Sequence, residues 1–455
     1  MTTNQDDIWT SLQTLVSDLL DKKKVPGAVV GVLHRGEVRS AGFGITNIDH
    51  PLPVTDDTLF QIGSITKTFT GTALMRLVEM GKLNLEATVR TYLPEFKVVD
   101  EAAAKGAKVR HLLTHMGGWI GDVFEDTGGG DDALARYVTG LAEAEQLAPP
   151  GTVWSYNNAG FSVAGYIIEH LTGQSFEAAL KELVLEPLGL EHSYLDPGQM
   201  MTYRFAAGHY DRDDGLQVAR PWPLPRAARP MGGIICSVKD LLRYARFHLG
   251  DGKNEAGDRL LKKETLAHMH APQVTVWGDQ QWALTWAYTK IEGAVQLSHG
   301  GGTVGQISWL GLLPEHDFAI AIFTNAGGGG AITRQASRWA LEHYLGLTTP
   351  EPEEMEVSEE DLRPYVGRYR RPFAEIELGL LGGKLVGQVT YKGSFPSKDT
   401  PPPPSPPPAS LTLCEPDRLL VLNGPFKGEQ ADVVRRPDGA IGWLRMGGRI
   451  HRREG

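Results

Sequence analysis

The sequence predicts an α/β (α+β) protein in which an antiparallel sheet flanked by helices adjoins a helical lobe, followed by a small all-β barrel. Three observations support this fold class. Strand-like runs occur near both ends of residues 1–347, and the stretch between them reads mainly as helix and loop. Residues 362–455 consist of short strand-like runs separated by glycine and proline. We therefore expect the two outer sets of strands in residues 1–347 to share one sheet, with a cleft beside the helical lobe.

The first elements are a helix and a hairpin. Apolar residues near the N-terminus recur at the spacing of one helical face: Ile8, Leu12, Leu15, Val16, Leu19 and Leu20. Residues 28–34 (AVVGVLH) and 37–44 (EVRSAGFG) read as strands, and Arg35-Gly36 between them is typical of a hairpin turn. The N-terminal stretch carries acids where an export signal carries bases, so we expect a surface helix and a cytoplasmic protein.

A buried helix is predicted from Ser64 to Met80 and is closed by Gly81. Its apolar residues follow one another at intervals of three or four positions: Ile65, Phe69, Ala73, Leu77 and Met80. Residues 84–275 read as mixed helix and loop, with helical patterns at 159–172, 176–189 and 237–250. The glycine-rich loop at 117–132 is expected to line the cleft.

Strand-like runs return after the helical middle. They lie between turn signals at 282–290, 294–300, 307–314 and 318–325. The following run, 331–346, is amphipathic and predicts a final helix. Residues expected on one face of that helix are Ile332, Ala336, Trp339 and His343.

The composition changes at residue 348 and divides the chain into domains. We expect a larger domain at 1–347, an acidic linker at 348–361 and an accessory β-barrel at 362–455. The proline-rich stretch 396–410 is interpreted as a surface insertion, with a docking peptide as the alternative. Two roles remain open for the barrel: it covers the cleft, or it joins subunits in a homo-oligomer.

Composition excludes several classes of function. The net charge of −10 argues against nucleic-acid binding, which needs a basic surface. No apolar run is long enough to span a membrane. Cys236 and Cys414 form neither a disulfide framework nor a CxxC motif, and no metal-binding motif occurs. We therefore expect neither a metal nor a cofactor, and a small molecule as the partner.

The stretch FQIGSITKTFT (60–70) carries the first candidate site. Residues at i and i+3 share a helix face, so the Lys67 amine can reach the Ser64 hydroxyl if Ser64 lies in the first turn. The Ser64 N–H would then be an unpaired donor, available to an oxyanion. Lys67 can act as a base only if its pKa falls towards neutrality, which burial would achieve. Taken alone, the spacing also occurs by chance on ordinary helices.

Two further segments supply candidate polar groups. Tyr156 and Asn158 lie on a loop before a helical pattern, where tyrosine can relay a proton and asparagine can orient a base or a substrate carbonyl. The alternative is a packed tyrosine and a helix-capping asparagine. His299 precedes glycines at a strand end, where backbone can approach a ligand and Gly302 N–H can be a second oxyanion donor. The alternative is a strand-to-strand turn with a satisfied edge histidine.

The three motifs together resemble those of a known superfamily. Ser64-Ile-Thr-Lys67, Tyr156-Asn-Asn158 and His299-Gly-Gly301, in this order, resemble the serine β-lactamase and penicillin-binding-protein superfamily. Flanking stretches are similar to the class C β-lactamase-type esterase and D-aminopeptidase branch: 109–119, 149–176, 186–193, 231–247 and 299–306. The resemblance covers roughly residues 8–347.

The resemblance implies a fold and a set of roles. The implied fold is a β-lactamase/transpeptidase-like sheet lobe with a helical lobe. Residues 1–347 would form the serine hydrolase domain, and residues 362–455 a lipocalin-like accessory barrel. Ser64 would be the acylated nucleophile, Lys67 its base, and Tyr156 a proton carrier. Asn158 would orient Lys67 or the substrate amide, and Ser64 and Gly302 N–H groups would form the oxyanion hole. The substrate-binding set is therefore Ser64, Asn158, His299, Gly301 and Gly302.

His299 departs from the lysine that many β-lactamases and transpeptidases carry at this point, and histidine is mostly neutral near pH 7. The expected activity is therefore a metal-independent serine hydrolase that cleaves small amides or peptides, including those with D-residues, through an acyl-enzyme. A carboxylesterase with incidental β-lactamase activity is the alternative. A non-catalytic penicillin-binding-like sensor is the alternative from another class. His115, His170, His192 and His316 are expected to be structural or exposed, and Trp119 and Trp286 to line the cleft or pack in the core.

Overall fold

The computed structural model describes residues 5–212, 215–393, 402 and 404–454. Part of the proline-rich stretch predicted at 396–410 lies outside the described residues. None of the described helices combines the length and the apolar composition that a membrane-crossing segment requires.

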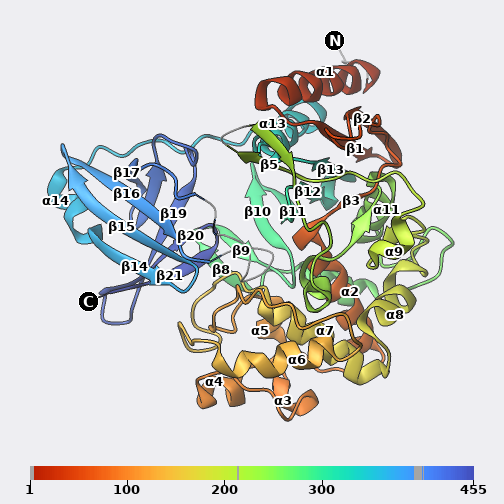
Figure 1. Cartoon of the computed structure of the whole chain (residues 1–455), viewed down its shortest axis with the longest axis horizontal. Coiled ribbons are helices and arrows are strands. Elements are labelled where there is room, and N and C mark those ends of the chain that lie inside the picture. The colour runs from red at the N-terminus through yellow and green to blue at the C-terminus, as the bar shows by residue number, and fades with distance from the viewer. Residues whose placement is uncertain (1–4, 213–214, 394–401, 403, 455) are drawn as a thin grey trace.

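An eight-stranded antiparallel sheet forms the centre of the larger part of the molecule (Figure 1). Its strands lie in the order β2 (Glu37–Gly44), β1 (Gly27–His34), β13 (Phe318–Thr324), β12 (Ile307–Leu313), β11 (Ala294–Gly302), β10 (Ala287–Ile291), β9 (Gln280–Trp282) and β8 (Val274–Trp277). Strand β1 pairs with β13 from Ala28 opposite Thr324 to His34 opposite Phe318. This pairing confirms that strands from the two ends of residues 1–347 share one sheet.

The predicted strand at 282–290 is two strands in the structure. Thr285 has a φ of 71°, a left-handed conformation that a continuous strand cannot contain. Strand β9 therefore ends at Trp282, and β10 begins at Ala287.

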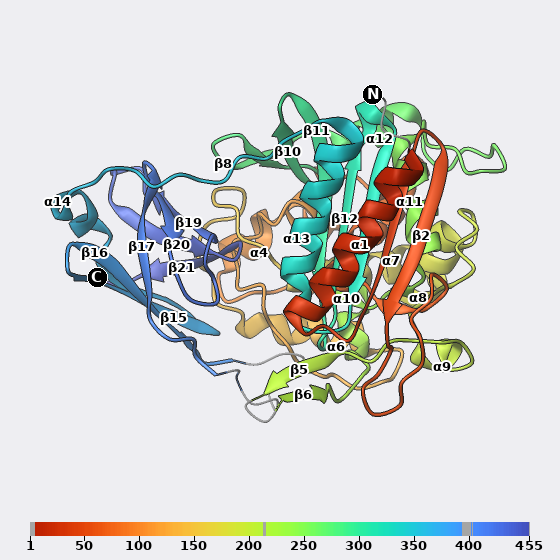
Figure 2. The ribbon, with the colours of Figure 1, turned by 90° about the horizontal axis from the view of Figure 1, so that it is seen from above.

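Helices cover both faces of the sheet because β1 is apolar on both sides. Val30 and Val32 contribute to a core formed with α1 (Gln5–Lys23) and α13 (Gly329–Ala340), which lie next to each other over the sheet (Figure 2). Val29 and Leu33 contribute to a second core on the opposite face, with α11 (Val238–Leu249) and α2 (Thr66–Glu79). The site helix α2 is thus packed directly beneath the sheet.

Two residues predicted on buried helix faces are exposed. Met80 follows the last residue of α2 and is 47% exposed. His343 lies in a π-helical turn, Leu341–Leu345, that continues α13. The wider turn shifts the residues that face the core, so His343 stacks on Trp339 at the surface, with ring centroids 3.9 Å apart.

The middle of the chain forms the helical lobe. Its helices are α3 (Val89–Tyr92), α4 (Glu101–Gly106), α5 (Val109–Leu113), α6 (Ala133–Gly140), α7 (Ala159–Thr172), α8 (Phe176–Leu180), α9 (Pro197–Met200), α10 (Arg229–Gly232) and α12 (Lys263–His270). The predicted helices at 159–172 and 237–250 match α7 and α11, whereas the one at 176–189 is α8 followed by a π-helical turn.

Two small sheets were not predicted, because their strands have two to four residues: β3 (Phe60–Gln61) with β7 (Ile235–Cys236) and β4 (Ser193–Tyr194), and β5 (His209–Arg212) with β6 (Gly215–Val218).

A closed antiparallel barrel of eight strands follows and confirms the predicted barrel. Its strands are β14 (Gly367–Arg371), β15 (Ala374–Leu381), β16 (Lys384–Tyr391), β17 (Ala409–Glu415), β18 (Arg418–Val421), β19 (Gln430–Arg435), β20 (Ile441–Met446) and β21 (Arg449–Arg453). The short helix α14 (Glu359–Leu362) precedes it. Strand β21, RIHRR, was not predicted because arginines replace the apolar alternation that marks a strand.

The barrel is docked on the segment that carries Tyr156. Arg445 NH1 donates to the Trp154 carbonyl at 3.1 Å, and Arg452 NH2 donates to the Gln146 carbonyl at 2.7 Å. The Ile450 N–H donates to Ser155 Oγ at 3.3 Å. These bonds fix the barrel to the loop that leads to Tyr156 within one chain.

Candidate active site

Ser64 lies in a single 3₁₀ turn, Gly63–Ile65, that leads into α2. Gly63 makes this turn possible, because its φ of 51° is in the left-handed region that glycine adopts without strain. A β-carbon at Gly63 would also lie 2.8 Å from the Gly302 nitrogen. The glycine therefore brings Ser64 directly against the end of strand β11.

The Lys67 amine lies one helical turn beyond Ser64. Its Nζ donates to Ser64 Oγ at 3.0 Å and to the Met231 carbonyl of α10 at 2.6 Å. The side chain is completely buried. The structure thus places the Lys67 amine beside the Ser64 hydroxyl, as their spacing in the sequence predicted. The Met231 carbonyl, which the sequence did not indicate, also orients the amine.

The surroundings of Lys67 favour a neutral amine. Burial lowers the pKa of Lys67 well below its usual value, and the positive charge of Arg449 lowers it further. The Asp122 carboxylate opposes these two effects on the pKa without overcoming them. A neutral amine has a lone pair that can accept the Ser64 hydroxyl proton, which a protonated lysine cannot do.

Tyr156 packs over the Lys67 amine. The amine lies 5.1 Å from the ring centroid, the Arg449 guanidinium carbon 4.6 Å and the His115 ring centroid 4.2 Å. Burial raises the pKa of Tyr156, and a hydrogen bond to the Ser64 side chain lowers it in part. The phenol is therefore protonated near neutral pH and lies where it can give a proton to a group at Ser64.

Strand β11 forms the other wall of the site. Its pairing with β10 ends at Ser298 opposite Ala287, whereas its pairing with β12 continues to Gly302 opposite Ile307. The edge of β11 from His299 onward is therefore not covered by β10. A β-carbon at Gly301 would lie 2.0 Å from the Ile62 carbonyl oxygen, so the backbone before Ser64 can approach only a glycine here.

His299 is held as a neutral imidazole. Its Nδ1 donates to the Gly300 carbonyl at 2.7 Å, which leaves Nε2 as an acceptor. Burial lowers the pKa of His299 to about 3, and the neighbouring Lys67 contributes to the shift. The structure thus agrees with the expectation that His299 is not a cation near pH 7.

Asn158 lines the same cavity as Ser64, but its amide Nδ2 donates to Asp122 Oδ1 at 2.8 Å. The Lys67 amine bonds to Met231 instead, so the structure does not give Asn158 the role of orienting Lys67. Asn157 rather than Asn158 caps α7, since its Oδ1 accepts from the Gly160 N–H at 2.8 Å. The role of Asn158 towards a substrate amide stays a prediction.

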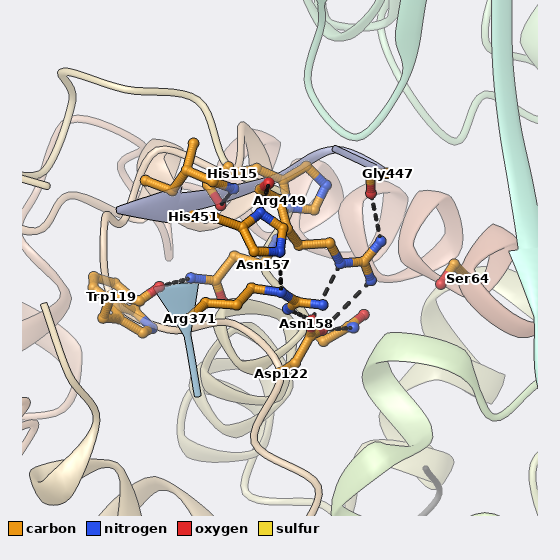
Figure 3. Close-up of polar contacts among 12 residues, drawn as sticks. Ser64, His115, Trp119, Asp122, Asn157, Asn158, Arg371, Gly447, Arg449 and His451 are labelled. Carbon is orange, nitrogen blue, oxygen red and sulfur yellow. Dashed lines mark hydrogen bonds and ion pairs between the residues drawn. The ribbon is translucent and has the colours of Figure 1, made fainter. Parts of the chain in front are cut away.

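The barrel contributes two arginines to the site (Figure 3). Arg449 binds both Asp122 oxygens, with Nε at 3.2 Å and NH2 at 3.4 Å, and Arg371 NH1 binds Asp122 Oδ2. Burial raises the pKa of Asp122, but the two guanidinium groups outweigh it and hold the pKa below its usual range. One carboxylate between two cations leaves this part of the site with a net positive charge.

The sequence did not predict Asp122, Arg371 or Arg449 as site residues. Asp122 lies within the glycine-rich loop at 117–132 that was expected to line the cleft, so only its specific role was missed. The arginines belong to a different part of the chain, and no local signal indicates that the barrel reaches the serine.

Two other expectations are refined by the structure. Trp119 and Trp286 are 2% and 0% exposed and belong to the core, whereas Trp282 lines the cavity. His115 is structural, as expected, but it contacts the site. Its Nδ1 accepts the Asn157 N–H at 2.9 Å, and its ring packs against Tyr156.

Comparison with known proteins establishes the family. The family model described as beta-lactamase matches residues 12–345. The chain belongs to the beta-lactamase family. Penicillin-binding protein 4 of Amycolatopsis lactamdurans is 35% identical over 356 residues, which cover 76% of this chain and 93% of that protein. A β-lactamase of Yersinia enterocolitica is 28% identical over 57% of this chain and 64% of its own length.

Solved structures of other members share the fold of this beta-lactamase-family protein. SurE aligns over 99% of this chain and 100% of its own, with a TM-score of 0.77 and 24% identity. An octameric penicillin-binding protein homologue from Pyrococcus abyssi aligns over 98% of this chain and 99% of its own, with a TM-score of 0.66 and 24% identity. Both alignments include the barrel, so the sheet, helical lobe and barrel recur together.

The close approach of Ile62 to Gly301 generates a first prediction. Gly301→Ala should lower the free energy of unfolding by about 1–3 kcal/mol, the usual cost of overpacking, because its methyl group would collide with backbone. Gly300→Ala is the matched control, since its nearest neighbour would lie 3.6 Å away. Denaturant unfolding measures both. Equal stability of the two variants would show that the contact between β11 and the Ser64 turn is loose.

The charges around Lys67 generate a second prediction, for the pH dependence of kcat/KM. Lys67 acts as a base only when neutral, so activity should fall as the pH drops through its lowered pKa. Arg449→Gln removes a positive charge that lowers the pKa of Lys67. The acid limb of the pH profile of kcat/KM should therefore move to higher pH. Arg452→Gln, on the same strand but bonded to the Gln146 carbonyl, should leave the limb in place. An unmoved acid limb in Arg449→Gln contradicts the assignment.

Proposed function

We propose that the protein is a serine hydrolase that cleaves small amide or peptide substrates, including peptides with D-residues, through an acyl-enzyme on Ser64. The observation that carries this proposal is the buried Lys67 amine, 3.0 Å from Ser64 Oγ, with a lowered pKa. A merely structural lysine would not need to be held neutral beside a hydroxyl. Tyr156 supplies a protonated acid at the same point.

The proposed reaction uses only groups of this chain. As Ser64 Oγ attacks the substrate carbonyl carbon, its proton passes to the Lys67 lone pair. The Ser64 and Gly302 N–H groups stabilise the oxyanion. The bond to the leaving group then breaks, and its nitrogen receives a proton from the Tyr156 phenol or from Lys67. Water attacks the acyl-enzyme with the same groups acting in reverse, which frees Ser64.

Relatives lend support to a peptide substrate. SurE has also been solved with D-Leu, and that structure aligns with a TM-score of 0.75. The relative that is 35% identical is named a penicillin-binding protein. We carry a preference for D-residues over to this chain as part of the proposal.

A carboxylesterase with incidental β-lactamase activity is the second candidate. The neutral His299 favours it, because this position offers no cation to a β-lactam carboxylate. A non-catalytic sensor is the third, and the combination of Ser64, Lys67 and Tyr156 argues against it, since binding alone requires no base.

We also propose that the protein forms a homo-oligomer through the outer surface of the barrel. The homologue from Pyrococcus abyssi is octameric by its title, which supports this proposal. Light scattering after size-exclusion chromatography measures the mass, and a monomer at micromolar concentration contradicts it.

The nucleophile is tested by covalent labelling. A fluorophosphonate should add one adduct to the intact protein, and peptide mapping should place it on Ser64. Ser64→Ala should abolish both labelling and turnover, because it removes the hydroxyl to which the Lys67 amine donates at 3.0 Å. Turnover that survives Ser64→Ala would exclude the proposed mechanism. Parallel assays with D- and L-aminoacyl p-nitroanilides, p-nitrophenyl esters and a chromogenic cephalosporin separate the peptidase from the esterase.

The proton-transfer groups are tested by substitution. Lys67→Ala and Tyr156→Phe should each lower kcat/KM by about 10²–10⁴-fold, the usual contribution of a general acid or base. Tyr137→Phe is a matched control, because its hydroxyl donates to the Val123 carbonyl. Losses of less than tenfold in both site variants would contradict the assigned roles.

A further inference from the structure

The strands of the barrel run alternately in opposite directions, which separates its two ends. The connections after β14, β18 and β20, together with the last residues of β16, lie at one end, called here the barrel mouth. Leu362 and Tyr365 pack into the barrel core at the opposite end, where the Tyr365 hydroxyl contacts Asp417 at the turn after β17. The barrel is therefore filled at the end away from the mouth.

Pairing between strands shows which side chains point into the barrel. Ile376 is paired with Tyr369 on one side and with Val389 on the other. Residues paired directly across antiparallel strands share a face, and Tyr369 is fully buried in the barrel core. Ile376 and Val389 therefore point inward. By the same argument Arg449 points inward with its partner Met446, which lies two residues beyond the core residue Leu444.

These inward-facing residues line the same cavity as the catalytic serine. The cavity has a volume of about 860 Å³ and is bounded by Ser64 and Tyr156 on one side. Its barrel wall is mostly apolar and includes Phe373, Ile376, Val389, Tyr391, Phe426 and Met446. The interior of the barrel thus opens onto Ser64, and the barrel is a wall of the substrate pocket rather than a neighbouring module.

We propose that the barrel mouth binds an apolar group of the substrate while the scissile carbonyl lies at Ser64. This inference rests on the proposed function and adds the substrate class: esters or amides that carry a bulky aliphatic or aromatic group. The mouth presents aliphatic and aromatic side chains to the cavity, and burying a substrate group against them is favourable. Its size and polarity match neither a small acetyl group nor a strongly polar one.

The charges between the barrel mouth and Ser64 further restrict the class of substrates that the cavity favours. Arg449 is 30% exposed towards the cavity and shares the single Asp122 carboxylate with Arg371. The resulting net positive charge disfavours a free ammonium group at this point and favours a carboxylate. The preferred substrate is therefore apolar, and an anionic group on it is favoured beside Arg449 but not beside Glu429, which lines the cavity at the connection after β18.

The test is a set of p-nitrophenyl esters from acetate to hexanoate, together with a set of acetate esters of phenols of similar acidity, from phenyl acetate to 4-tert-butylphenyl acetate. Wild-type kcat/KM should rise at least roughly tenfold along one of the two sets, which also shows whether the acyl or the leaving group enters the mouth. No rise along either set overturns the proposal.

Two variants assign the selectivity to the mouth. Val389→Trp fills the mouth and should remove most of the increase in kcat/KM along the ester set. The isosteric Val389→Thr should reduce this increase without adding bulk. Val386→Trp is the matched control, because Val386 lies on the same strand with the opposite orientation and should keep both activity and selectivity. Unchanged selectivity in both Val389 variants overturns the proposal. Fluorophosphonate labelling of Ser64 in each protein separates this failure from a failure of the proposed function.

Discussion

Burial of the Lys67 amine is the constraint on which the rest of the site depends. A fully buried ammonium would need a carboxylate beside it, whereas Lys67 has a hydroxyl and a carbonyl as hydrogen-bond partners. Asp122 is the nearby carboxylate that acts on its pKa, and two arginines neutralise that carboxylate. The lowered pKa of Lys67 thus depends on three features: helix α2 is buried beneath the sheet, the Met231 carbonyl accepts a hydrogen bond from the amine, and Arg449 adds positive charge.

That positive charge comes from the barrel, which therefore forms part of the candidate site. The Tyr156 N–H donates to the Gly448 carbonyl at 2.8 Å, so the loop before β21 also fixes the backbone of Tyr156, the proposed proton carrier. The same loop leads to Arg449, which packs on the Tyr156 ring and binds Asp122. The positioning of Tyr156 and part of the positive charge are in this way supplied by Gly448 and Arg449, the latter 293 residues from Tyr156, and other strands of the same barrel form one wall of the cavity.

The sequence predicted the parts of the fold whose signals are local. Hydrophobic periodicity located β1, β2, β13, α1 and α7, and the spacing of Ser64 and Lys67 indicated that the amine lies beside the hydroxyl. Features that depend on packing between distant segments could not be predicted from the sequence. The Met231 carbonyl carries no side-chain signal, and the bond from Asn158 to Asp122 joins two loops that no motif relates. Arginines at 371 and 449 read as surface charge, because only the closed barrel shows that they point inward at its mouth.

The most direct test of the account is the pKa of Lys67 itself, measured by NMR titration of ¹³Cε-labelled lysines with Lys67→Arg to assign the signal. The account predicts that Lys67 titrates well below the other lysines, whose ordinary pKa is about 10.4, and remains neutral near pH 7. A Lys67 signal that titrates together with the surface lysines would mean that the amine is charged at neutral pH. Such a result would contradict its role as the base that activates Ser64.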